Sequence, residues 1–209
     1  IVDLHTHSTA SDGSFSPSAI LQLASELKIR AVALTDHDTI AGIEEFVQIG
    51  KQYHDLETVP GVEVSVTCQK REIHITGLFI DHKCQALAKV LADIQTKRSQ
   101  RNLIMVDKIS SLGYDLTYED IKNAAGGEVI GRPHFAKALV RKGYFSTPQE
   151  VFEKCLRRGA LAYCERVLLS PAEAIQAIHN AGGLTFWAHP LSRPGENASS
   201  LRRVMKELV

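Results

Sequence analysis

The order of elements in the first fifty residues limits the fold more than any other feature of the sequence. Residues 1–4 form a short apolar run, and a Ser-Pro helix start with apolar residues at helical spacing follows in SPSAILQLASELK. Residues 31–35 (AVALT) form a second apolar run, and a second helix is predicted in IAGIEEFVQIGKQY. Such repeated units bury a sheet beneath helices, so they predict a parallel β/α architecture.

The rest of the chain interrupts this alternation and then resumes it. Residues 58–67 and 72–79 are rich in β-branched residues and predict two further strands. From Cys84 the pattern becomes helical, with one long amphipathic stretch to Leu112 and shorter helices near residues 117–125, 133–142 and 148–157. A Ser-Pro helix at 170–183, a buried strand at 184–190 and a last helix near the end follow.

We therefore predict an α/β barrel interrupted by an inserted helical subdomain. The expected parts are a first barrel segment at 1–83, the insert at 84–169 and a second barrel segment at 170–209. The helical pattern at the end stops in the middle of an element. We therefore expect the C-terminal part of the barrel to be missing from this chain.

The charges are distributed unevenly between these parts. The segment 83–169 carries 15 Lys/Arg and 9 Asp/Glu, which leaves 9 Lys/Arg and 15 Asp/Glu in the remainder of this electrically neutral chain. This asymmetry suits an anionic ligand held beside a metal-binding carboxylate cluster, although solvated helix faces also explain it. The sequence has no bilayer-length apolar run, no signal peptide and no paired cysteine motif, which predicts a cytoplasmic protein with reduced thiols and no membrane partner.

Polar residues occur where the apolar strands end. His5 and His7 follow the first strand, Asp36 and His37 follow the second, and His189 follows the last, while Glu63 and His74 lie within strands. Strand ends gather at one edge of a parallel sheet, and residues two apart face the same side, so this group predicts a metal site. A lone buried Glu63 would be costly unless cations neutralised it. Imidazole and carboxylate ligands suit Mn, Fe or Zn.

Other candidate residues depend on weaker signals. His134 in GRPHFAKAL belongs to the insert, and Arg98, Arg101 and Arg132 could bind phosphate in bidentate fashion or serve as exposed helix charges. His54, His82 and His179 are interpreted as surface, packing or capping residues.

An ordered series of motifs resembles the polymerase and histidinol phosphatase (PHP) superfamily. The series consists of DLHTHSTASDG, LTDHDT, GVEV, HITGL, GRPH and AHP. It is most similar to the branch that contains nucleoside 3′,5′-bisphosphate phosphatases and RNase AM type 5′→3′ exoribonucleases. The resemblance implies a distorted (β/α)7 barrel with two or three divalent metal ions, Mn first, with Fe, Zn or Mg as alternatives.

The resemblance also implies roles for residues. His5, His7 and Glu63 would hold one metal, Asp12 and His37 a second, and Glu63, His74 and His134 a third. His189 would face the substrate phosphate together with the insert arginines, which makes Glu63 and His189 the candidate catalytic residues. The family's late Asp-x-His metal ligands are absent from these 209 residues.

The predicted function is hydrolysis of a phosphate ester by a metal-activated water. The expected substrates are a nucleoside 3′,5′-bisphosphate or a short 5′-phosphorylated single-stranded RNA, with no obligate protein partner. Two alternatives remain open: a phosphatase of the histidinol phosphate type, and a non-catalytic scaffold that keeps some metal ligands. The absence of a nucleophile loop such as G-x-S-x-G agrees with attack by water.

Overall fold

The structure is a computed structural model that describes residues 1–69, 71–125, 129–191 and 197–208. The chain divides into two compact units, one formed by Ile1–Ile94 with Leu168–Val209 and the other by Gln95–Val167. Within the described residues, every helix is too short or too polar to cross a bilayer.

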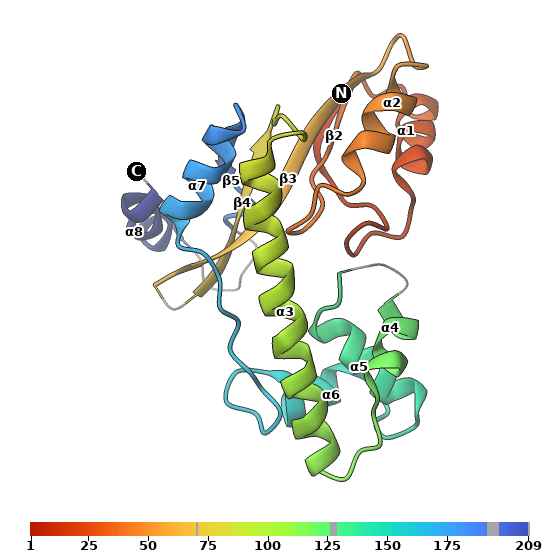
Figure 1. Ribbon diagram of the computed structural model, residues 1–209, viewed down its shortest axis with the longest axis vertical. Helices are drawn as coiled ribbons and strands as arrows, with labels where there is room; N and C mark the ends of the chain where they lie inside the picture. The colour runs from red at the N-terminus through yellow and green to blue at the C-terminus, as the bar shows by residue number, and fades with distance from the viewer. Residues whose placement is uncertain (70, 126–128, 192–196, 209) are drawn as a thin grey trace. The chain divides into compact units, whose positions relative to one another are not determined.

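The first unit is built on a five-stranded mixed sheet (Figure 1). Its strands lie in chain order: β1 (Val2–Thr6), β2 (Ala31–Leu34), β3 (Glu57–Cys68), β4 (Arg71–Leu78) and β5 (Leu184–Trp187). The first three strands are parallel, but β4 is antiparallel to β3, and β5 is antiparallel to β4. The prediction of a parallel architecture is therefore wrong for β4, which runs opposite to the other four strands, whereas β5 again runs in the direction of β1, β2 and β3. Only two residues connect β3 to β4, and a parallel crossover requires about a dozen or more.

Two helices pack together beside β2 (Figure 1). They are α1 (Pro17–Glu26) and α2 (Ile43–Gly50), and their apolar residues Leu21 and Phe46 share a core with Leu34 of β2. The start of α1 follows the predicted Ser-Pro pattern, because the Ser16 side chain accepts a hydrogen bond from the Ala19 N–H at 3.2 Å. These helices cover the strands from which the first two loops of the site emerge.

The strands β3 and β4 have one apolar face and one polar face. Val62, Val64 and Ile75 pack against the first part of α3 (Gln85–Ser111) and against α7 (Pro171–Asn180). Because side chains alternate along a strand, Glu63 and Ser65 lie on the opposite face. Glu63 therefore lies on the polar face of a strand whose apolar and polar side chains alternate. The helix α8 (Ala198–Leu208) adds Val204 to the same apolar core.

The last strand differs from its sequence prediction. We predicted a buried strand, but Leu184 and Phe186 of β5 are 56% and 50% exposed. Among the strands that the structure describes, β5 pairs with β4 alone, so it is an edge strand with an open side. Apolar residues alone could not distinguish an edge strand from a central one.

The second unit is helical and has its own core. It contains the remainder of α3, α4 (Tyr118–Ala125), α5 (Arg132–Arg141), α6 (Pro148–Val151) and the π-helix η1 (Phe152–Leu156). Met105, Phe135 and Leu139 are buried in this core. The helix α3 ends before Gly113, whose φ of +88° suits a glycine C-terminal to a helix. All four cysteines are free thiols: Cys68, Cys84, Cys155 and Cys164.

Truncating Leu139 to Ala should lower the free energy of unfolding by about 2–5 kcal/mol, because its fully buried side chain would leave a cavity. The matched change Leu161→Ala, in the same unit but at a side chain that is 72% exposed, should cost less than about 0.5 kcal/mol. Urea unfolding monitored by circular dichroism measures both. Equal losses would contradict the described core.

Candidate metal centre

The Glu63 carboxylate lies among the side chains of five histidines. They come from four of the five strands or from the loops after them: β1, the loops after β1 and β2, the body of β4 and the loop after β5, while Glu63 itself belongs to β3. The distances from a ring nitrogen to the nearest carboxylate oxygen are 3.1 Å for His5, 3.1 Å for His7, 3.2 Å for His37, 3.0 Å for His74 and 2.8 Å for His189. Glu63 itself is fully buried.

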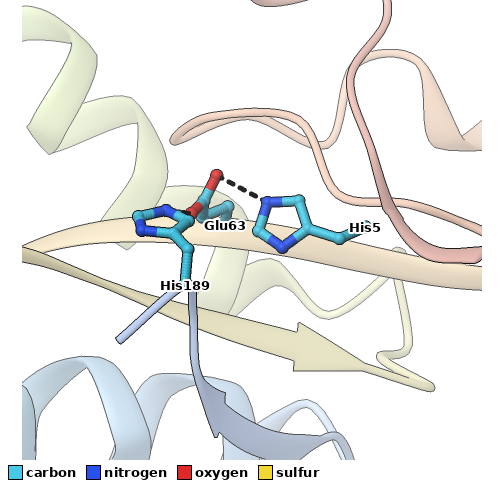
Figure 2. A group of neighbouring side chains, drawn as sticks. All are labelled: His5, Glu63 and His189. Carbon is cyan, nitrogen blue, oxygen red and sulfur yellow. Dashed lines mark hydrogen bonds and ion pairs between the residues drawn. The ribbon is translucent and has the colours of Figure 1, made fainter. Parts of the chain in front are cut away.

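The two carboxylate oxygens serve different histidines. Oε2 faces His5, His7 and His37, while Oε1 faces His74 and His189. Figure 2 shows Glu63 between the imidazoles of His5 and His189, with its carboxylate joined to the His5 ring. A carboxylate in this position can bridge two neighbouring cations.

The antiparallel strands bring His74 and His189 to this place. His74 pairs with Ser65 of β3, so the beginning of β4 lies beside the end of β3. The Ala188 N–H then donates to the His74 carbonyl at 3.0 Å, which places His189 next to His74. His189 has a φ of +32°, an unfavourable conformation for a residue other than glycine. Such residues persist where the surrounding structure holds them, often at functional sites.

Asp12 completes the cluster from the loop after β1. Its Oδ1 lies 3.5 Å from Nδ1 of His7, and its Oδ2 lies 3.7 Å from Nε2 of His37. The loop turns tightly because both Ser11 and Gly13 donate their N–H groups to the Ser8 carbonyl, at 3.0 and 2.9 Å. A Cβ atom on Gly13 would lie only 2.0 Å from the His7 carbonyl oxygen. Gly13 therefore permits the close return that brings Asp12 toward the histidines.

Charge interactions in the cluster outweigh burial for most of these groups. Burial disfavours the Glu63 carboxylate, but hydrogen bonds from His5, His7 and His74 hold its pKa well below the ordinary value. Burial also opposes a charged imidazole, yet hydrogen bonds to Glu63 and Glu72 raise the pKa of His74 to about 9. The Glu63 contact raises the pKa of His7 despite burial, whereas burial prevails at His37 and lowers its pKa.

The residues present fit divalent metal ions. Three groups each place one ligand atom per residue within 4.8 Å of one another: His5, Glu63 and His189; His7, Asp12 and His37; and His37, Glu63 and His74. Nδ1 of His7 and Nδ1 of His37 lie 3.5 Å from Asp12 and 3.2 Å from Glu63, but among the described residues neither has a partner in hydrogen-bond geometry, and Nε2 of His5 lies 3.0 Å from Nε2 of His7. Converging nitrogen lone pairs of this kind suit a cation, and the donor set of nitrogen and oxygen suits Mn, Fe or Zn.

The other predicted site residues belong to the helical unit, Gln95–Val167. His134 is in the first turn of α5, where its Nδ1 accepts a hydrogen bond from the Gly131 N–H at 3.0 Å. Arg101 is buried with its Nη1 3.0 Å from Sδ of Met105, and Arg132 lies over the Tyr163 ring at 5.7 Å. Arg98 lines a cavity of about 70 Å³ with Asn102 and Tyr118. The predicted roles of these four residues stay predictions.

Two histidines interpreted as structural have local partners. His82 pairs with Glu44 at 2.8 Å, and His179 lies 3.3 Å from the Thr185 hydroxyl. Buried polar residues also lie behind the ligand candidates. Of these, Asp36 was expected in the strand-end group itself, whereas Ser8, Ser11, Asp38 and Ser65 had no predicted role. The signal that could have found them is the pair of aspartates that flank His37.

The raised pKa of His74 predicts a pH dependence of the metal-free protein. His74 should keep its proton at neutral pH and lose it near pH 9, as followed by NMR of the ring. Because the folded-state pKa exceeds the ordinary value of 6.5, this proton stabilises the fold fully below pH 6.5, and the contribution is lost as the pH rises through about 9. Glu63→Gln should lower the pKa of His74. A midpoint near 6.5 in the unchanged protein would contradict the described contacts.

Gly13→Ala should weaken Mn²⁺ binding by at least about tenfold, because the added methyl group would displace the backbone that carries His7 and Asp12. Isothermal titration calorimetry measures the affinity, and circular dichroism shows whether the variant is folded. A folded variant with unchanged affinity would show that the loop adapts without disturbing the ligands.

Comparisons with known proteins cover nearly the whole chain. The 5′-3′ exoribonuclease Rnm of Escherichia coli strain K12 is 35% identical over 206 residues, which cover 98% of this chain and 70% of that protein. A 3′,5′-nucleoside bisphosphate phosphatase of Chromobacterium violaceum is 33% identical over 190 residues, covering 90% of this chain and 66% of that protein. An amidohydrolase from Chromobacterium violaceum, determined with bound sulfate and no metal, has a similar fold with a TM-score of 0.87.

That solved structure is 31% identical to this chain, and the match covers 99% of this chain and 72% of the other. The family model of the PHP domain matches residues 3–163, which include all the described ligand candidates except His189. The motifs, the mixed sheet with its polar cluster and these matches agree with one another. The chain belongs to the PHP domain family.

Proposed function

We propose that this chain is the catalytic part of a metal-dependent phosphoesterase that hydrolyses phosphate esters of nucleotides. The observation that carries the proposal is the buried Glu63 carboxylate, which five imidazoles contact within 3.2 Å. A buried cluster of ligand atoms is costly without ions, so its presence favours a catalytic metal centre. The names of the similar proteins, an exoribonuclease and a nucleoside bisphosphate phosphatase, support the same reaction class.

The proposed metal ligands follow the three groups of converging atoms. We assign His5, Glu63 and His189 to one ion, His7, Asp12 and His37 to a second, and His37, Glu63 and His74 to a third. Mn²⁺ is the first candidate, with Fe, Zn and Mg as alternatives. Divalent ions in such sites polarise a phosphoryl group and lower the pKa of the attacking water.

The chain's own residues have separate tasks in this proposal. Glu63 offers one oxygen to each side of the cluster and so sets the spacing between neighbouring sites. His189 lies at the exposed side, where a substrate phosphate approaches, and its strained backbone fixes the ring against Glu63. Nε2 of His189 lies 2.8 Å from Oε1 of Glu63, so in this proposal His189 shares an ion with Glu63 and also contacts the phosphate.

The helical unit is the proposed source of further phosphate contacts. Arg98, Arg101 and Arg132 belong to the basic segment, and guanidinium groups bind phosphate oxygens in bidentate fashion. His134 is the proposed insert ligand of the third metal, with its ring oriented by the Gly131 N–H. The units themselves are proposed to be a barrel and an insertion, as the sequence predicts.

We propose that further strands close the sheet in the complete protein. The edge strand β5 has an open side with exposed Leu184 and Phe186, and β1 at the other edge exposes Val2. Apolar side chains on an unpaired edge favour pairing with additional strands. Those strands would also supply the Asp-x-His ligands that the family pattern adds.

Two substrates fit the proposal best: a nucleoside 3′,5′-bisphosphate and a short 5′-phosphorylated RNA. A histidinol phosphate phosphatase is the alternative with the same chemistry, and no described residue favours it. A non-catalytic scaffold is the alternative from another class. A scaffold has no need of a buried cluster of charged and polar ligands, whose burial carries a free-energy cost.

Phosphate release by the full-length protein with added Mn²⁺ tests the proposal. The substrates are a nucleoside 3′,5′-bisphosphate, a 5′-phosphorylated RNA oligonucleotide and histidinol phosphate. Glu63→Gln should reduce release by at least about 100-fold, because it removes the shared ligand. Glu57→Gln is the matched control on the same strand, at an exposed position away from the cluster, and should leave the rate unchanged.

The outcomes separate the alternatives. Release from the bisphosphate, or stepwise shortening of the RNA, supports nucleotide phosphoester hydrolysis and ranks the substrates. Release from histidinol phosphate alone would overturn the nucleotide assignment. A folded, metal-loaded protein that releases phosphate from none of the three would overturn the catalytic proposal in favour of the scaffold.

A further inference from the structure

We propose that Asp36 and Asp38, which flank His37, are positioning residues that fix the metal ligands of two neighbouring segments. Asp36 holds the loop that carries His7 and Asp12, and Asp38 holds the strand that carries Glu63. The inference rests on the metal centre of the proposed function, but it concerns residues outside the ligand groups. Residues 36–38 would then hold in place both the loop after β1 and the strand β3.

Asp36 binds the loop after β1 through three donors. Its Oδ1 accepts hydrogen bonds from the Ser8 N–H at 2.7 Å and from the Ser11 hydroxyl at 2.5 Å, and its Oδ2 accepts from the Ser8 hydroxyl at 2.7 Å. The carboxylate is only 1% exposed. Ser8 follows the ligand His7, and Ser11 precedes the ligand Asp12. Asp36 therefore fixes the loop directly beside both ligands.

Asp38 makes the equivalent contact on the other side of His37. Its Oδ1 accepts from the Ser65 N–H at 2.7 Å, and its Oδ2 accepts from the Ser65 hydroxyl at 3.0 Å. Asp38 is fully buried and has a φ of +52°, which few residues other than glycine adopt. Its N–H also donates to the Glu63 carbonyl at 2.8 Å. The segment thus joins β3 at Glu63 and again two residues later.

The choice of carboxylates at these two positions has a physical reason. A buried carboxylate costs free energy unless several donors solvate it, and hydrogen bonds to a charged acceptor are stronger than those between neutral groups. The serine hydroxyls and backbone N–H groups supply such donors at short distances. The segment therefore resists displacement when the charges of the metal centre change.

The two aspartates predict different consequences. Loss of Asp36 should release the loop of His7 and Asp12, and so weaken the group of His7, Asp12 and His37. Loss of Asp38 should loosen Glu63, which belongs to the other two groups. Because outer residues orient ligands, each loss should weaken Mn²⁺ binding by about 10–100-fold at the affected site.

The experiment measures Mn²⁺ affinity and stoichiometry by isothermal titration calorimetry on the full-length protein, without any substrate. Its variants are Asp36→Ala, Asp36→Asn, Ser11→Ala, Asp38→Ala, Ser65→Ala and the double variants. Asp120→Ala in the helical unit is the matched control. Its carboxylate also accepts three hydrogen bonds, from the Thr117 N–H, the Thr117 hydroxyl and Lys142. This control should lose stability but keep its Mn²⁺ affinity.

The double variants show whether each aspartate acts through its serine. Ser11→Ala should add little to Asp36→Ala, and Ser65→Ala should add little to Asp38→Ala, because each pair shares one interaction. Ser65→Ala combined with Asp36→Ala should give a larger, nearly additive loss. Asp36→Asn should fall between the unchanged protein and Asp36→Ala, because the amide oxygen still accepts a hydrogen bond.

A folded Asp36→Ala protein with unchanged Mn²⁺ affinity and stoichiometry would overturn the proposal, as would an equal loss of affinity in Asp120→Ala. If Asp36→Ala does not fold, the milder Ser11→Ala removes a single hydrogen bond and must show the loss by itself. The readout is metal binding and needs no substrate. A protein that binds Mn²⁺ as proposed but hydrolyses nothing would therefore refute the proposed function alone.

Discussion

The structure of the site depends on one buried carboxylate. Glu63 has no access to water, and its charge is stabilised by imidazoles from four other segments of the sheet unit. Two pairs of those imidazoles are also within hydrogen-bond distance of each other, with nitrogen atoms 3.0 Å apart between His5 and His7 and 3.2 Å apart between His74 and His189. Each of the five strands, or the loop after it, must therefore bring a side chain to the same place, or the charge would be left unpaired at a large cost in free energy.

The mixed strand directions of the sheet bring these side chains together. Two parallel neighbours bring the loops after β1 and β2 to the end of β3, and the hairpin returns β4 so that its beginning meets the same edge. The apolar residues on the other face of β3 and β4 pack against α3 and α7, which fixes the direction in which Glu63 and His74 point. The packing of the apolar face of β3 and β4 therefore fixes where the candidate ligands lie on the polar face.

The same cluster offers its lone pairs to either protons or cations, because both would neutralise Glu63. In the absence of metal, hydrogen bonds to Glu63 and Glu72 keep a proton on His74 and raise its pKa to about 9. Cations would compete with that proton for the same lone pair, so metal binding and proton release are coupled. The buried aspartates beside His37 keep the backbone in place in either state, since their partners are serines and N–H groups whose charge does not change.

The sequence by itself determined the class of the fold and most of the candidate ligands. Short apolar strands, Ser-Pro helix starts and histidines at strand ends are patterns of neighbouring residues. They can be recognised in the sequence because the periodicity of a strand or helix produces them. Glu63, His5, His7, His37, His74 and His189 were placed in one site by such patterns, and Asp12 was added by the family resemblance. All seven lie together in the structure. The roles of His134 and the insert arginines stay predictions, because they depend on contacts that lie beyond local pattern.

Only the tertiary structure decided the strand directions, the exposed edge at β5 and the supporting contacts of Asp36 and Asp38. Short apolar runs occur in parallel and antiparallel strands and in edge and central strands. The pairing partners of each strand therefore follow only from the tertiary structure. A serine that binds an aspartate 25 residues away leaves no periodic signal in either segment. The sequence encodes which residues are candidate metal ligands, whereas the way in which the fold holds them depends on contacts between segments that are distant along the chain.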